Sequence, residues 1–344
     1  MLRNELLFER PAELQATAPA EARGLQRDEV RLLVSTPDGH EHAVFRQLDE
    51  YLRPGDLLVV NRSATIPASL PATAALGEFR LNLSTRYGGG LWLAEPRWSA
   101  NRPGPLPLER GETIAVAGTP ATVVGPHPGL PRLWFVRLDA GAERLLWRMG
   151  SPIRYGYVQN TYPLAMYQTI FARQAGSAEM PSAGRPFTRR VVERLTARGV
   201  DIAGIVLHTG VSSLEVESDR LEDHPMYAEP FQVPVATADA VNRARQAGRR
   251  VIAVGTTVVR ALETAWDGCA VRPAQGFTSI FIHPGRAVQT VDGLISGFHD
   301  PLASHLAMLY AVAGEDLVRS AYREAVAQRY LWHEFGDSHL LLRR

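Results

Sequence analysis

The sequence predicts an α/β main domain with a small all-β, barrel-like domain inserted into it. Two observations carry this prediction. Short alternating or apolar runs, separated by Gly, Pro and Asn, fill residues 71–149, whereas helical and strand patterns alternate after residue 149. The first pattern is typical of a small antiparallel barrel or sandwich, and the second of an α/β domain. We therefore assign residues 1–62 and 150–344 to the main domain and residues 63–149 to the insertion.

The main domain opens with mixed patterns and a turn at residues 53–56, followed by a short buried strand expected over Leu57–Val60. Further along, apolar residues recur at the spacing of one helix face, and continuous apolar runs between these segments predict strands. The helices are expected over residues 186–198, 236–247, 258–265 and 315–329, and the strands over residues 202–207, 251–254 and 279–283. This order predicts βα units.

The insertion shows five short strand patterns, over residues 79–83, 91–94, 113–116, 121–124 and 133–138. Segment Pro96–Pro107 is rich in Pro, Arg and Asn, and we expect it to be an exposed loop.

The composition bounds the class of protein. The chain has 344 residues, of which 45% are hydrophobic, and a formal net charge of +1. No apolar run approaches the ~18 residues of a membrane-spanning helix, and the first residues lack the hydrophobic core of a signal peptide. Cys269 is the only cysteine, which excludes an internal disulfide framework. These features favour a cytoplasmic enzyme with no membrane partner.

Several kinds of chemistry are excluded. The chain contains no lysine, so all 37 basic residues are arginine, and neither a Schiff base nor a P-loop lysine can form. No G-x-G-x-x-G follows a strand, and no G-x-S-x-G is present. The ten histidines lack the spacing of metal ligands, so we expect no metal.

The most informative segment begins at Val251. An apolar run over Val251–Val254 precedes the turn Gly255-Thr256-Thr257, after which apolar residues recur at helical spacing. A helix that starts directly after a strand offers free N–H groups to a carboxylate or phosphate. Arg260 and Glu263 lie one turn further on. From the geometry alone, an ordinary βα turn with a surface ion pair explains the segment equally well.

The same segment resembles a known family. G-T-T-x-V-R-x-L-E followed by G-x-T-x-I-F-I-x-P-G is similar to a signature of the S-adenosylmethionine:tRNA ribosyltransferase-isomerases of queuosine synthesis. Other pieces follow in family order, among them Pro54-Gly-Asp-Leu-Leu-Val-Val-Asn61, Tyr167-Gln-Thr169, Asp223-His224 and Gly336-Asp337. The resemblance implies the same two-domain arrangement, with S-adenosylmethionine as co-substrate. It also implies transfer of the ribosyl part to 7-aminomethyl-7-deazaguanine in tRNA, rebuilt as an epoxycyclopentane, with release of adenine and methionine.

That chemistry needs a base near the 5′-carbon of the sugar, an acid for the departing adenine and a partner for the methionine carboxylate. The residues that match family motifs are the candidates. The catalytic candidates are His208, His224, His299 and Glu229, and the substrate-binding candidates are Gly255, Thr256, Thr257, Arg260, Glu263, Thr188 and Phe298. A lone histidine at a strand end is also common as a purely structural residue.

The chain departs from the family at several polar positions. P-T-A-G-L-H-F-T is here Pro181-Ser-Ala-Gly-Arg-Pro-Phe-Thr188, and N-D-T-R-V is Asn61-Arg-Ser-Ala-Thr65. L-H-V-G-L-G-T-F becomes Leu207-His-Thr-Gly-Val-Ser-Ser-Leu214, and N-F-H-L-P-K-S-T becomes Gly297-Phe-His-Asp-Pro-Leu-Ala-Ser304. Glu179 and Asp300 are carboxylates that the family does not usually carry there.

Three hypotheses follow: the family reaction on tRNA, a diverged enzyme that uses S-adenosylmethionine on a small-molecule acceptor, and a non-catalytic nucleoside-binding relative. The departures and the net charge of +1 predict weak or absent activity on tRNA with the donor site kept. Arg189, Arg190, Arg194 and Arg198 cluster on one expected helix, where a solvated face is a simpler explanation than an RNA contact.

Overall fold

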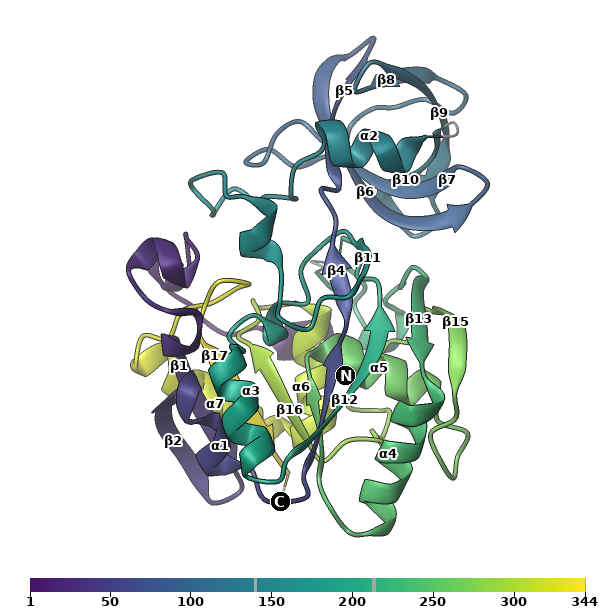
Figure 1. The fold of residues 1–344 in the computed structure, drawn as a ribbon. Coiled ribbons are helices and arrows are strands. Elements are labelled where there is room, and N and C mark those ends of the chain that lie inside the picture. Colours follow the sequence, from purple (N-terminus) through teal and green to yellow (C-terminus); the bar gives the residue numbers. More distant parts are fainter. Residues whose placement is uncertain (139–140, 212–214, 344) are drawn as a thin grey trace.

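The computed structural model describes residues 1–138, 141–211 and 215–343. An α/β body and a separate β-barrel are joined by extended segments that include β4 and β11 (Figure 1). The predicted fold class is therefore confirmed. In the part of the chain that is described, no helix is both long and apolar enough to cross a membrane.

A nine-stranded mixed sheet forms the centre of the α/β body. In spatial order its strands are β15 (Ala274–Thr278), β13 (Glu229–Val233), β12 (Asp201–Leu207), β3 (Leu57–Asn61), β14 (Val251–Val254), β16 (Gly293–Gly297), β17 (Ser338–Leu342), β1 (Arg31–Thr36) and β2 (Gly39–Val44). Strands β12, β3, β14 and β16 run parallel, so their carboxyl ends meet at one edge. Strand β17 runs antiparallel to β16 and brings its amino end to the same edge.

Helices cover both faces of this sheet. They are α1 (Leu48–Tyr51), α3 (Arg189–Ala197), α4 (Val235–Gln246), α5 (Thr256–Thr264), α6 (Ser304–Ala313) and α7 (Glu315–Ala327). Successive side chains of a strand point to opposite faces. Leu57 and Val59 accordingly share a core with α4 to α7, whereas Leu58 and Val60 share one with α1 and α3. Continuous apolar strands are the pattern expected for a sheet that is buried on both faces.

The inserted domain is a closed six-stranded antiparallel barrel. Its strands are β5 (Ser69–Ala74), β6 (Gly77–Gly88), β7 (Leu91–Arg97), β8 (Thr113–Val116), β9 (Thr119–His127) and β10 (Leu130–Leu138). Helix α2 (Ala142–Met149) adds Leu145 and Leu146 to the barrel core. Outside the barrel, β4 (Ser63–Thr65) pairs in parallel with β11 (Gln174–Ser177). The domain boundaries at residues 62–63 and 149–150 stay a prediction.

One predicted strand is wrong. The strand expected over residues 279–283 lies earlier, at β15, and pairs only with β13. The apolar residues that suggested it leave the sheet edge, because the Thr278 hydroxyl accepts from the Ile280 N–H at 3.2 Å and turns the chain. Ile282 is then fully buried in the core as part of a loop. The helix expected from residue 186 begins at Arg189, because Thr188 is its N-cap.

The side chain of Asn61 fixes the edge where the parallel strands end. The last paired residues of β12 and β3 are Ile205 and Asn61. Beyond them, the Asn61 amide takes over the role of the strand ladder: its oxygen accepts from the Leu207 N–H at 3.1 Å, and its nitrogen donates to the Leu207 carbonyl at 2.9 Å. The same amide accepts from the Ser63 N–H and donates to the Thr257 hydroxyl. One buried side chain thus joins β3, β12 and the start of α5.

We expect Asn61→Leu to lower the free energy of unfolding by about 2–5 kcal/mol, because it leaves buried backbone groups of Leu207 and Ser63 without partners. Asn101→Leu, on an exposed loop, is the matched control and should change it by less than about 0.5 kcal/mol. Urea denaturation measures both values. Equal effects of the two substitutions would contradict the bracing role of Asn61.

Candidate functional site

A cavity of about 180 Å³ opens at the carboxyl ends of β14 and β16. The turn Gly255–Thr257 forms one wall, and residues 296–301, which follow β16, form another. Gly255 has a φ of +96°, which disfavours any other residue at this tight connection. The cavity therefore sits where open α/β sheets usually bind ligands, beside the amino end of α5.

Two tyrosines approach the cavity from the segment that follows the barrel. Tyr155 donates a hydrogen bond to Glu179, and the ring of Tyr157 stacks on His333 with centroids 4.6 Å apart. His333 in turn contacts Asp300 through an ion pair. Arg10 lies 2.9 Å from the other Asp300 oxygen, so this carboxylate has two cationic partners. Aromatic faces and carboxylates together suit a cationic group.

Two buried histidines lie at the floor of the cavity. His299 Nε2 is 2.8 Å from the Ser296 hydroxyl, and its ring stacks on His305 with centroids 4.9 Å apart. Burial lowers the pKa of His299 well below its ordinary value and that of His305 to about 4. Both rings are therefore neutral near pH 7.

Glu334 is the opposite case. Burial, reinforced by the charge of Glu179, raises the pKa of the Glu334 carboxyl to about 8. Its Oε1 atom is buried and has no hydrogen-bond partner among the described residues. The side chain therefore carries a proton near neutral pH and faces the cavity with that proton available.

Comparison with known proteins bears on what this cavity serves. Residues 3–341 match the model of a family described as queuosine biosynthesis protein. The chain belongs to this family.

Its relatives in the family resemble it over nearly their whole length. The S-adenosylmethionine:tRNA ribosyltransferase-isomerase of Rubrobacter xylanophilus is 42% identical, covering 99% of this chain and 98% of the relative. The protein of the same name from Anaeromyxobacter sp. (strain Fw109-5) is 39% identical, covering 98% and 97%. A crystal structure of the S-adenosylmethionine tRNA ribosyltransferase from Thermotoga maritima matches with a TM-score of 0.56 and 31% identity, covering 98% of this chain and all of that one.

Five of the residues singled out from the sequence line the cavity. Gly255, Thr256 and Thr257 contribute from the start of α5, and Phe298 and His299 from the end of β16. The structure thus brings two separate family motifs together at one edge of the sheet. Their part in binding or catalysis stays a prediction.

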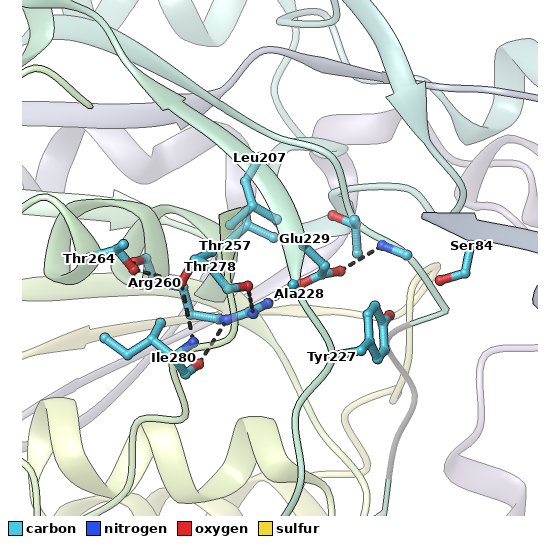
Figure 2. A network of polar contacts seen from close by, with 12 residues as sticks. Ser84, Leu207, Tyr227, Ala228, Glu229, Thr257, Arg260, Thr264, Thr278 and Ile280 are labelled. Carbon is cyan, nitrogen blue, oxygen red and sulfur yellow. Dashed lines mark hydrogen bonds and ion pairs between the residues drawn. The ribbon is translucent and has the colours of Figure 1, made fainter. Parts of the chain in front are cut away.

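Arg260, Glu229 and Glu263 lie away from the cavity lining and serve the packing of the sheet. Figure 2 shows Arg260 between β13 and β15, where it forms an ion pair with Glu229 and donates to the carbonyls of Thr278 and Ile280. Glu229 also accepts from the Gly210 N–H at 2.6 Å. Glu263 accepts three hydrogen bonds from residues 289–290. The intact G-T-T-x-V-R-x-L-E motif is therefore partly a structural motif.

The other candidates are also outside the cavity lining. Thr188 caps α3 and donates to Asp28 at 2.6 Å. His208 Nδ1 is 2.8 Å from the Ser63 hydroxyl, which is bonded to that of Ser177. His224 is buried beside Phe281, and burial lowers its pKa. Residues 212–214, where the sequence departs from a family motif, lie outside the described residues.

Sequence reasoning missed most of the polar cavity wall: Tyr155, Tyr157, His305, His333 and Glu334. None of these belongs to a motif on which the resemblance was based. The available signal was their position beside Asp300 and Gly336-Asp337, since residues adjacent to a motif at the strand edge face the same opening.

We expect Arg260→Ala to lower the free energy of unfolding by about 3–5 kcal/mol, because the Glu229 charge is left buried and unpaired. The double variant Arg260→Leu/Glu229→Gln removes that charge and should recover part of the loss. Chemical denaturation of the three proteins measures this coupling. A stable Arg260→Ala protein whose only defect is weaker binding of S-adenosylmethionine would instead favour a direct ligand contact.

The raised pKa of Glu334 predicts a pH effect on stability. Between its ordinary value of 4.5 and about 8, the unfolded chain loses this proton while the folded chain keeps it. The free energy of unfolding should therefore fall as pH rises through that window and level off above it. Glu334→Gln should remove this contribution. Denaturation of both proteins at pH 5, 6.5 and 8 measures it, and parallel curves would show that Glu334 titrates normally.

Proposed function

We propose that this chain transfers the ribosyl part of S-adenosylmethionine to 7-aminomethyl-7-deazaguanine in tRNA and releases adenine and methionine. The observation that carries the proposal is the similarity, over nearly the full length of both chains, to proteins named S-adenosylmethionine:tRNA ribosyltransferase-isomerase. A cytoplasmic location fits a protein that acts on tRNA.

The cavity has the chemistry that S-adenosylmethionine needs. The backbone N–H groups at the start of α5 suit the methionine carboxylate. The sulfonium carries a positive charge, which the ring faces of Tyr155 and Tyr157 and the carboxylates of Glu179 and Asp300 attract. The Oγ of Thr209, buried and without a partner among the described residues, offers a hydrogen bond to the sugar or the base.

A second hollow, between the barrel and the segment that follows it, supports an RNA acceptor. Arg80, Arg97 and Arg154 line it together with the aromatic side chains of Trp98 and Tyr162. Proteins that recognise unpaired RNA loops combine aromatic and arginine side chains in this way. Arg97 also lies over the ring of Tyr155, which reaches the first cavity. The two hollows are therefore neighbours.

The arginines of α3 do not add to this surface. Arg190 forms an ion pair with Asp28, Arg194 with Asp49, and Arg198 donates to the Leu52 carbonyl. They tie α3 to the amino-terminal segments.

A small-molecule acceptor is the second candidate. Glu179 and Asp300, which family motifs do not usually carry, both line the cavity and make it more acidic. Such a change alters which acceptor amine is favoured without affecting the barrel.

The test measures adenine release from S-adenosylmethionine by the pure protein alone, with unmodified tRNA, and with tRNA that carries 7-aminomethyl-7-deazaguanine. The proposal expects release only with the last, together with an epoxycyclopentane product. Release with the free base 7-aminomethyl-7-deazaguanine but not with tRNA would favour the small-molecule acceptor, as the sequence departures predict. Binding without release under every condition would mean a non-catalytic relative.

A further inference from the structure

We propose that Glu179 and Glu334 are the acid–base pair of this cavity, with protonated Glu334 giving a proton to the departing adenine and the Glu179 carboxylate removing the proton next to the sulfonium. This inference rests on the proposed function and adds to it the residues that move protons.

The two carboxyl groups meet from distant parts of the chain. Glu179 follows β11, Glu334 precedes β17, and both line the same cavity. Each also raises the pKa of the Tyr157 phenol, so both face that ring. The pair is thus held on two segments that the sheet brings to one edge.

Their surroundings differ in the way that sorts an acid from a base. Glu179 accepts a hydrogen bond from the Tyr155 phenol, which favours its charged form. Glu334 has a buried oxygen without a partner among the described residues, which favours its neutral form. Two titratable groups whose environments push their protonation apart are the usual signature of such a pair. Arg185, Tyr157 and Tyr167 are the other titratable groups that interact with Glu334.

The histidines of the cavity are poorly placed for these tasks. His299 and His305 are buried and uncharged, and His299 Nε2 is engaged by Ser296. His333 is bound to Asp300 and covered by Tyr157. The carboxyl pair is what remains with a proton to give and a charge to receive one.

The proton balance of the proposed reaction fits one proton shared by the pair. A five-membered carbocycle built from the ribose carbons requires a new bond between C1′ and C5′. Glu179 takes a proton from C5′, which the sulfonium makes acidic, and the electron pair left on C5′ forms that bond. The electrons of the bond between C1′ and adenine leave with the base, and the Glu334 proton goes to an adenine ring nitrogen. Neutral adenine departs, Glu179 is left protonated, and Glu334 is left ionised.

The experiment compares Glu334→Gln, Glu179→Gln and the exposed control Glu193→Gln with the unmodified protein. Adenine release is measured from pH 6 to 9.5 with the acceptor that supports turnover, and S-adenosylmethionine binding is measured by calorimetry. In the unmodified protein, release should decline above about pH 8, as Glu334 loses its proton. Glu334→Gln should slow release by about 10²–10⁴-fold, remove that decline and leave binding within a few-fold.

Glu179→Gln should slow release similarly and shift the remaining alkaline decline to lower pH, because the nearby negative charge is gone. A merely structural role would not move the decline. Glu334→Asp, which keeps an acid, should retain part of the activity if Glu334→Gln folds poorly. Unchanged rates and an unchanged decline in both glutamine variants would overturn the pair and leave the proposed function intact. An unmodified protein that releases no adenine with any acceptor would overturn the proposed function and the pair with it.

Discussion

The Asn61 amide is the interaction on which the site depends. Parallel strands deliver their carboxyl ends to one edge, but a ladder of backbone hydrogen bonds stops where the strands diverge, and the freed groups must find other partners. Asn61 satisfies both backbone groups of Leu207 and reaches Thr257 at the start of α5. The strand ends can therefore separate enough to leave a cavity without exposing or orphaning the backbone. The arrangement of Gly255, Thr256 and the segment after β16 around that cavity follows from it.

Burial then decides the protonation state of each group at this edge. The same loss of water that makes His299 and His305 neutral keeps a proton on Glu334. Asp300 is the exception because Arg10 and His333 contact it, and burial next to cations lowers the pKa of that carboxyl despite desolvation. A small, water-poor cavity can thus hold an ionised carboxylate and a protonated one at the same pH.

The sequence was sufficient for the fold and for part of the site. Apolar runs such as Val251–Val254 and the change of pattern near residue 149 predict the α/β body and the barrel, because both depend on periodicity. The strand expected at residues 279–283 was wrong, since a continuous apolar run also describes a loop that covers a core. Tyr155 and Glu334 could not be found from the sequence. They reach the cavity through irregular segments, whose course depends on tertiary contacts that periodicity does not record.

The motif residues and the polar residues of the cavity have separate tasks. Arg260 and Glu263, inside the most recognisable motif, satisfy buried carbonyls, amides and Glu229, so substitution there harms the fold whatever the substrate. Glu179 and Asp300 have fewer structural obligations and project into the cavity from segments that tolerate change. A family that keeps the first set preserves its architecture, and variation in the second set adjusts charge and proton transfer within it. Motif similarity therefore carries information mainly about the frame, and the chemistry has to be argued from the residues that the frame brings together.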